Sequence, residues 1–348
     1  MKILFIIIIC MLFIPNINAS YIIMDSDNSR VIEGSDVSTK RHVASISKIM
    51  TAIIAIESGM LDDIVKVGDE VKSSYGSGIY IKENEQLKLI DLVYGLMLRS
   101  GNDAALAIAK YVAGDIESFV KLMNEKAKEL KMYNTVFNNP HGLEVNGGNI
   151  STTYDMALLS SYAINNEIYR EITQTKNYKL KTNLNYYDWT NKNKLLSMYK
   201  YAIGGKTGYT EIAKRTLVTN ARKNNMEFTI VTLNEPNDFE LHKNLYTETF
   251  ELYKNYKILK KGKIKIIGYD ISNGYLYINN NYNVTLNEIE RENLILKFKI
   301  NDKYIESNNK VGVIEVILYD KVIYSEDIYI KITKDTFIKK IRKWLFDK

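Results

Sequence analysis

Residues 44–58 read ASISKIMTAIIAIES, with isoleucines that recur at helical spacing up to Gly59. This pattern predicts a helix over residues 45–58 that opens on Ser45 and is closed by the glycine. Ser45 and Lys48 are three positions apart, so they share one face of the helix and the amine can reach the hydroxyl. A serine at a helix start is most often only a cap, so this spacing alone does not establish a catalytic role.

Two further short signals follow in the chain. Ser100-Gly101-Asn102 occupies the corner between predicted helices at 87–98 and 102–112, and Lys206-Thr207-Gly208 ends a predicted strand at 200–207. A Ser-Gly-Asn turn or a Lys-Thr-Gly strand end is common by itself. The three signals together, in the order helix, interhelical loop and strand, are typical of active-serine, penicillin-recognising enzymes.

These residue types suit acyl transfer through a covalent intermediate. Ser45 is the candidate nucleophile and Lys48 its candidate general base, because isoleucine-rich surroundings would remove water from the amine and lower its pKa. Ser100 and Asn102 can relay a proton and hold a substrate amide. Lys206 adds a second positive charge, which helps to keep Lys48 neutral and attracts a carboxylate.

The backbone around the third signal completes the candidate site. The N–H groups of Ser45 and Tyr209 are candidates for an oxyanion hole. Lys206, Thr207, Gly208 and Tyr209 are together expected to bind the substrate.

At these residues the chain resembles the low-molecular-mass penicillin-binding proteins that are serine-type D-alanyl-D-alanine carboxypeptidases of bacterial cell walls. The resemblance runs from about residue 21 to 256, and its best-matching segments are residues 44–52, 92–109, 139–143, 153–157 and 205–210. It implies an α/β plus all-β fold. A penicillin-recognising catalytic domain, similar to β-lactamases and DD-peptidases, would carry the site in a cleft between its sheet and a helical cluster, and a small all-β domain would follow.

The resemblance also implies a reaction. The protein would remove the terminal D-alanine from peptidoglycan stem pentapeptides through an acyl-enzyme on Ser45, would bind β-lactam antibiotics covalently, and would need no cofactor.

Two departures from the family pattern concern substrate binding. Family members usually carry Ala-Gly after the third signal, where this chain has Ala213 and Lys214. They also tend to carry an arginine at the start of the next helix, here predicted at 239–253, that is thought to bind the substrate's terminal carboxylate. His242 or Lys243 lies nearest to that position, and we expect His242 to bind substrate.

The two ends of the chain predict its location. Residues 1–19 combine Lys2 with an apolar run from Ile3 to Ile14, which is typical of a secretory signal peptide. An uncleaved anchor or a buried segment is the alternative. We expect an exported protein at the outer face of the cytoplasmic membrane or in the cell wall.

Beyond the leader, residues 20–257 are expected to form the catalytic domain. Residues 258–333, with short alternating segments, are expected to form the all-β domain, with a boundary near 255–262. Residues 334–348 predict a basic amphipathic helix that associates with an anionic membrane surface. A short helix packed on the β domain, or a frayed tail, is the alternative.

Composition excludes several other classes. Lys and Arg number 47 against 41 Asp and Glu, a net charge of +6 that is spread along the chain, so we expect no nucleic-acid partner. The single cysteine, Cys10, lies in the leader, which excludes a disulfide framework. The three histidines lack metal-ligand spacing, and we expect no metal.

Two remaining candidates are expected to have structural roles. His141 is expected to shape its loop, and Trp189 to belong to the core or the rim.

Three alternatives use the same signals. A β-lactamase of class A needs a glutamate on a loop to activate water. The only acid between residues 138 and 150 is Glu144, which lacks the Glu-x-x-Leu-Asn context, and a β domain is foreign to those enzymes. A DD-endopeptidase or transpeptidase on the same site remains open, since cleft shape decides the acceptor. A catalytically weak wall-binding homologue also remains open, because of Lys214 and the missing arginine.

Overall fold

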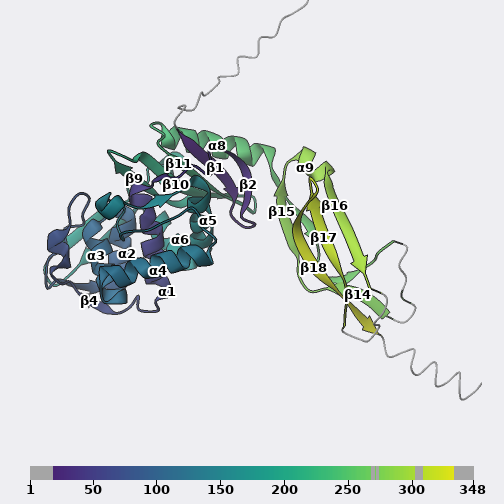
Figure 1. The fold of residues 1–348 in the computed structure, drawn as a ribbon, viewed down its shortest axis with the longest axis horizontal. Helices are drawn as coiled ribbons and strands as arrows, with labels where there is room; N and C mark the ends of the chain where they lie inside the picture. The colour runs from purple at the N-terminus through teal and green to yellow at the C-terminus, as the bar shows by residue number, and fades with distance from the viewer. Residues whose placement is uncertain (1–18, 268–270, 272–273, 302–308, 333–348) are drawn as a thin grey trace, which may run out of the picture. The chain divides into compact units, whose positions relative to one another are not determined.

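The structure is a computed structural model that describes residues 19–267, 271, 274–301 and 309–332 (Figure 1). The chain divides into two compact units between Glu248 and Thr249. The sequence placed this boundary later, near 255–262. The predicted leader, except for Ala19, and the predicted helix at 334–348 lie outside the described residues.

A five-stranded antiparallel sheet forms the centre of the first unit. Its order is β2-β1-β11-β10-β9, built from β1 (Ser20–Asp25), β2 (Arg30–Ser35), β9 (Ala202–Thr210), β10 (Lys214–Lys223) and β11 (Met226–Leu233). Asn224 and Asn225, with φ of 52° and 59°, form the tight turn between β10 and β11, since asparagine tolerates the left-handed backbone that such hairpins require. The strand that carries Lys206-Thr207-Gly208, β9, is an edge strand of this sheet.

Helices cover both faces of the sheet. One face packs against α5 (Thr153–Ile164) and α6 (Glu167–Gln174), and the other is covered by α8 (Asp238–Leu252) (Figure 1). The buried helix α1 (Lys48–Glu57) lies at the centre of the helical cluster, where it contacts α2 (Leu89–Arg99), α3 (Asn102–Ala113) and α4 (Ile116–Glu129).

Short elements complete this unit. They are β3 (Arg41–His42), β4 (Ile64–Lys66), β5 (Gln86–Lys88), β6 (Ile150–Ser151), β7 (Asn177–Lys181), β8 (Tyr186–Thr190), α7 (Leu195–Met198) and three 3₁₀ turns, η1 (Ala44–Ser47), η2 (Asp69–Ser73) and η3 (Val145–Gly147).

The second unit is rich in strands, as the sequence predicts. Five strands pair in the order β13-β14-β18-β17-β16, and β12 pairs with β15. Their bounds are β12 (Lys254–Leu259), β13 (Gly262–Ile264), β14 (Gly274–Ile278), β15 (Tyr282–Leu286), β16 (Leu294–Ile300), β17 (Lys310–Leu318) and β18 (Lys321–Ile332). A short helix, α9 (Glu288–Glu292), was not predicted. It forms because Asn287 and Glu290 make a reciprocal capping box that satisfies backbone N–H groups at the first turn.

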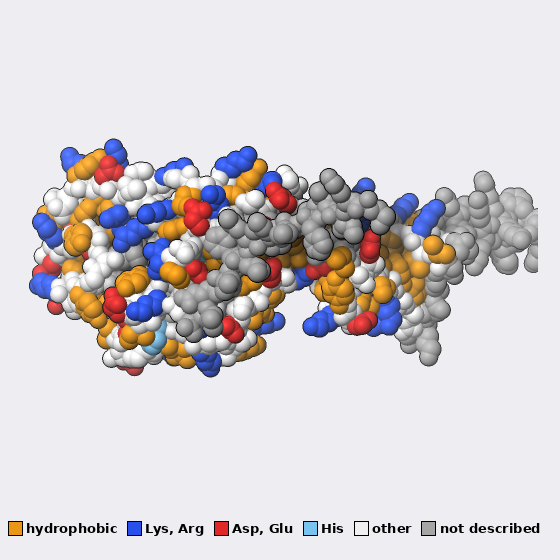
Figure 2. Space-filling model, turned by 90° about the horizontal axis from the view of Figure 1, so that it is seen from above, with side chains coloured by type: hydrophobic (Ala, Val, Ile, Leu, Met, Phe, Trp, Pro, Cys, Tyr) orange, Lys and Arg blue, Asp and Glu red, His pale blue; other side chains and the backbone are white. Residues whose placement is uncertain are grey.

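The described surface carries both signs of charge. Lys and Arg side chains are distributed over the face shown in Figure 2, with Asp and Glu side chains among them. No helix within the described ranges is long and apolar enough to cross a membrane.

Candidate active site

The turn before α1 aligns Ser45 with Lys48. The sequence predicts a regular helix from Ser45, whereas residues 44–47 form a 3₁₀ turn and the α-helix begins at Lys48. In a 3₁₀ turn the side chains at i and i+3 are nearly eclipsed, which suits a contact between these two residues better than a regular helix does. Lys48 Nζ lies 2.9 Å from Ser45 Oγ.

Lys48 is completely enclosed by protein. Its Nζ donates to Asn102 Oδ1 at 2.7 Å and to the backbone oxygen of His141 at 2.5 Å. Burial lowers the pKa of Lys48 well below its usual 10.5, and the charge of Lys206 lowers it further. The amine therefore approaches the neutral form that a base requires at neutral pH.

The corner between α2 and α3 holds Asn102 in a strained segment. Ser100 has φ of 66°, a left-handed backbone that residues other than glycine seldom adopt. Asn102 Nδ2 donates to the backbone oxygen of Tyr75 at 2.7 Å, which fixes the amide and turns its oxygen toward Lys48. Next to it, the buried carboxylate of Asp103 accepts hydrogen bonds from the backbone of Ile79 and Tyr80.

Lys206 forms a second buried lysine–serine contact. Its Nζ lies 3.0 Å from Ser100 Oγ and 2.7 Å from the backbone oxygen of Thr207. Burial, followed by the charge of Lys192, lowers the pKa of Lys206 to about 7. Two hydroxyls, Ser45 and Ser100, thus each meet a lysine whose proton is weakly held.

Gly208 brings strand β9 against the start of η1. A Cβ at this position would lie 2.4 Å from Thr216 Oγ1 and 3.0 Å from the backbone nitrogen of Ser45, so only glycine permits the approach. The backbone that leads to Tyr209 therefore lies beside the Ser45 N–H. A close approach of these two segments is one condition for the predicted oxyanion hole of Ser45 and Tyr209.

Comparisons with known proteins agree with this geometry. The family model described as D-alanyl-D-alanine carboxypeptidase matches residues 14–237. The chain belongs to the D-alanyl-D-alanine carboxypeptidase family. It is 32% identical over 261 residues to D-alanyl-D-alanine carboxypeptidase DacF of Bacillus subtilis, a match that spans 71% of this chain and 67% of that protein.

Solved structures extend the likeness to both units. The carboxypeptidase DacD of Francisella tularensis shares 25% identity, with a TM-score of 0.71, over 91% of this chain and 95% of that one. Penicillin binding protein 5 of Haemophilus influenzae, at 24% identity, has a TM-score of 0.76 over 91% of this chain and 98% of that one. The predicted fold class is confirmed, and the carboxypeptidase is a low-molecular-mass penicillin-binding protein and a hydrolase.

The structure does not bring His242 to the carboxypeptidase site. The His242 side chain is fully buried, and its ring nitrogens contact Thr219 Oγ1 at 2.7 Å and Thr232 Oγ1 at 3.0 Å. Thr219 follows Val218, which pairs with Lys206, so His242 lies on the sheet face opposite to the Lys206 side chain. Burial lowers the pKa of His242 to about 3, so the ring is neutral. The expectation that His242 binds substrate is therefore corrected: it is a core residue.

Sequence analysis also missed two residues that contribute to the surroundings of Lys48. The backbone oxygen of His141 accepts from Lys48, whereas its ring is buried, with a pKa lowered to about 3 by burial and then by Lys48. Lys192 is exposed, with Nζ 3.2 Å from Ser77 Oγ, and its charge lowers the pKa of both Lys48 and Lys206. The left-handed Gly142 directly after His141 marks a tight loop and was an available signal, but nothing in the sequence pattern identified Lys192.

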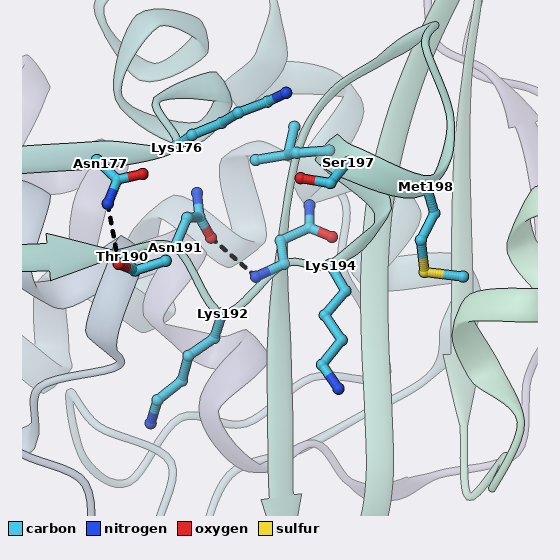
Figure 3. Close-up of a pocket in the computed structure, with 10 residues that line it drawn as sticks. Lys176, Asn177, Thr190, Asn191, Lys192, Lys194, Ser197 and Met198 are labelled. Atoms are coloured by element: carbon cyan, nitrogen blue, oxygen red, sulfur yellow. Dashed lines mark hydrogen bonds between the residues drawn. The ribbon is translucent and has the colours of Figure 1, made fainter.

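Lys192 also borders a hollow beside the cluster. Lys176, Lys192 and Lys194 line it together with the amides of Asn177, Asn191 and Asn193 (Figure 3). These lysines make this side of the site positively charged. Within the described part of the chain, no group of three or more His, Cys, Asp or Glu residues could hold a metal ion.

Proposed function

We propose that the protein is a serine D-Ala-D-Ala carboxypeptidase that removes the terminal D-alanine from peptidoglycan stem pentapeptides through an acyl-enzyme on Ser45. The observation that carries this proposal is the set of three contacts made by Lys48. A neutral amine has two N–H donors and one lone pair. The charged ammonium donates to Ser45 Oγ at 2.9 Å and to the oxygens of Asn102 and His141; after it loses one proton, these two oxygens accept the two remaining N–H groups and the lone pair faces the Ser45 hydroxyl. This is the hydrogen-bond pattern of a base that is ready to take the serine proton.

Acylation follows from this arrangement. The Ser45 proton passes to Lys48 as Ser45 Oγ attacks the carbonyl carbon of the penultimate D-alanine. The N–H groups of Ser45 and Tyr209 stabilise the negative oxygen of the tetrahedral intermediate. When the C–N bond breaks, the proton that Lys48 took from Ser45 passes to the leaving amine, with Ser100, bonded to Lys206, as the proposed relay, and Lys48 is neutral again.

Deacylation regenerates the enzyme. Water attacks the ester carbonyl, its proton passes to the neutral Lys48, and Ser45 leaves with a proton to restore the free hydroxyl. A β-lactam would acylate Ser45 in the same way. Its leaving group stays attached to the acyl portion after the ring opens, which supports the proposal that penicillin forms a long-lived adduct.

Two measurements on one preparation test the proposal. The protein is incubated with a fluorescent penicillin, and D-alanine release from a stem pentapeptide is measured. A carboxypeptidase labels and releases D-alanine with water as the acceptor. A transpeptidase or endopeptidase forms or cleaves crosslinked peptides, a β-lactamase hydrolyses the penicillin without lasting label, and a wall-binding homologue without turnover releases no D-alanine.

We propose further that the protein is exported and associates with the membrane surface through residues 334–348. The apolar leader in residues 1–19 and the basic amphipathic pattern of the tail support this location. Deleting residues 335–348 should move the protein from the membrane fraction to the soluble fraction without changing its activity on a soluble peptide. A truncated protein that still sediments with membranes would contradict the anchor.

A further inference from the structure

A second hollow, of about 470 Å³, lies outside the set of catalytic residues described above. It is lined by residues of the segments 78–82 and 185–190 together with Arg99. The side chains of Tyr80 and Tyr186 at this hollow are 77% and 64% exposed, so their rings are open to a ligand. We refer to it as the aromatic hollow.

Two chain segments connect the aromatic hollow to the corner at residues 100–102. Arg99, which lines the hollow, directly precedes this corner. The backbone oxygen of Ser77 accepts from the N–H of Asn102 at 2.8 Å, and the next residue, Gly78, lines the hollow. On both segments, therefore, the hollow begins one residue away from the catalytic corner.

A stem peptide is long enough to reach from this corner to the hollow. Lys48 Nζ contacts both Ser45 Oγ and Asn102 Oδ1, so the carbonyl that Ser45 attacks lies beside the corner. Four residues separate that carbonyl from the sugar that carries the stem, and four extended residues span at most about 14 Å. We therefore expect the sugar end of the substrate within reach of the aromatic hollow.

Tyr80 is held in a strained backbone conformation at this hollow. Its φ is 63°, a left-handed value that a bulky residue seldom adopts. The buried carboxylate of Asp103 accepts from the backbone N–H groups of Tyr80 at 2.6 Å and of Ile79 at 3.0 Å, which fixes the segment. Because the Tyr80 side chain is 77% exposed, burial does not explain why a tyrosine occupies this position. Strain of this kind is typical of functional sites.

A second buried carboxylate joins the two walls of the hollow. Glu85 is fully buried, and it accepts from the backbone N–H of Lys82 at 2.9 Å on one wall. On the other wall it contacts the hydroxyl of Tyr187 at 3.0 Å and the amide of Asn185 at 3.1 Å. Trp189, only 4% exposed, packs against Tyr187 with ring centroids 5.1 Å apart. The hollow is therefore formed before a ligand binds, which reduces the entropy lost on binding.

The lining of the aromatic hollow suits a neutral, polar ligand. Lys82 and Arg99 supply donors and Asp188 supplies an acceptor, beside the exposed tyrosine rings. The hollow of Figure 3 differs, because its lining residues include three lysines and no acid, which suits an anion. A sugar has an apolar C–H face that can pack on an aromatic ring, and its hydroxyl and acetamido groups can pair with polar side chains at the edge.

We propose that the aromatic hollow binds the glycan of peptidoglycan at the sugar that carries the stem peptide, with Tyr80 and Tyr186 packing against its rings. This inference rests on the proposed function, because it extends the same substrate from its peptide to its glycan. A glycan held in the hollow would present its own stem to Ser45, so the protein would act on stems that are still attached to sugar in preference to free peptides.

The test compares two substrates: the free stem pentapeptide, and the same pentapeptide joined to its N-acetylglucosaminyl-N-acetylmuramic acid disaccharide. The wild-type protein should show a kcat/KM for D-alanine release that is about 10-fold higher for the disaccharide form, mainly through a lower KM. Tyr80→Gly and Tyr186→Ala should each lower this ratio of the two substrates about 2- to 10-fold, the amount expected for the loss of one aromatic contact.

Two controls separate sugar binding from folding. Tyr133→Ala removes a tyrosine that is also 77% exposed but does not line the hollow, so the ratio should not change. Tyr80→Gly relieves the left-handed backbone at this position, so its Tm should rise while the ratio falls. A purely structural role for Tyr80 would lower the rates for both substrates equally and leave the ratio at its wild-type value.

The outcomes distinguish this inference from the proposed function. If the wild-type protein releases D-alanine equally well from both substrates, or if both tyrosine variants keep the wild-type ratio, the glycan inference is wrong and the carboxypeptidase proposal stands. If the wild-type protein releases no D-alanine from either substrate, the carboxypeptidase proposal fails. The hollow is then judged by calorimetric titration with the disaccharide alone, its lactyl carboxylate capped as an amide. Binding that Tyr80→Gly weakens and Tyr133→Ala does not would support the inference, and an absence of binding would overturn it.

Discussion

Replacing Lys206 with methionine should stabilise the protein at neutral pH while it abolishes activity. Burial lowers the pKa of Lys206 from 10.5 to about 7, so the native state holds this proton less tightly than the unfolded chain does. A lysine with a depressed pKa destabilises the fold in full below the native pKa, and this penalty disappears as the pH rises through the unfolded pKa. The two pKa values correspond to a penalty of about 4 kcal/mol at pH 7 and about 2 kcal/mol at pH 9.

Methionine removes this penalty but also removes two hydrogen bonds. The contacts of Lys206 with Ser100 Oγ and the Thr207 backbone oxygen contribute about 1 kcal/mol each. The variant should therefore be about 2 kcal/mol more stable than the wild type at pH 7, and the two should be nearly equal at pH 9. The buried amine is retained for function at a cost to stability.

Urea unfolding of both proteins at pH 7 and pH 9 measures this difference. Lys243→Met is the control, since it removes a lysine from the surface, where the Lys243 side chain is 41% exposed. A Lys206→Met variant that is less stable than the wild type at pH 7, or a difference that stays constant between the two pH values, would refute the reasoning.

Three further substitutions test the base, the backbone approach at Gly208 and the strained turn at Lys214. Because the pKa of Lys48 is lowered by burial, the rate of Ser45 acylation by penicillin should rise with pH as Lys48 loses its proton. Lys48→Arg, which cannot deprotonate, should lower that rate about 10²- to 10⁴-fold in stopped-flow labelling, and an active arginine variant would contradict the base role. Gly208→Ala should lower acylation about 10²-fold or more, because its Cβ would displace β9 from the Ser45 N–H; near-normal labelling would show that this approach is unimportant. Lys214→Gly should raise the free energy of unfolding by about 1 kcal/mol, since Lys214 has a left-handed φ of 58°; a loss of stability in urea would show that the lysine is not strained there.

Much of the fold could be predicted because its signals are local. The isoleucine spacing after Ser45, the Asn224-Asn225 turn and the alternating segments of the second unit all have counterparts in the structure. The departure of Lys214 from the family pattern has a local consequence for the backbone. Lys214 is the first residue of β10, after a three-residue connection from β9, and its left-handed backbone favours glycine, yet this chain places a lysine there.

The prediction that His242 binds substrate was wrong because of tertiary packing. The position of His242 in the sequence indicated that it is near the start of a helix, but not which side of that helix faces the sheet. The His242 ring contacts Thr219 and Thr232, whereas Asp238, one helical turn earlier, forms an ion pair with Arg215 of β10 at 2.6 Å. A charge pair that joins β10 to α8 leaves no pattern in either segment, and only the folded structure brings Arg215 and Asp238 together.

Lys192 was missed for a similar reason. It lies in the irregular segment after β8, where no periodicity constrains its direction, and its influence on Lys48 and Lys206 acts through space. The site residues that sequence analysis did identify lie on regular elements or tight turns. Ser45 and Lys48 lie within one turn, Ser100 and Asn102 at one corner, and Lys206 on an edge strand.

The central claim is that Ser45 is the nucleophile activated by Lys48, and intact-mass spectrometry after incubation with penicillin tests it most directly. The wild-type protein should gain the mass of one penicillin, and peptide mapping should place the adduct on Ser45. Ser45→Ala should show no gain in mass while it remains folded. Ser47→Ala should still be labelled, because the Ser47 hydroxyl is buried and donates to the backbone oxygen of Ala44 at 2.8 Å. A penicillin adduct that persists in Ser45→Ala would contradict the account.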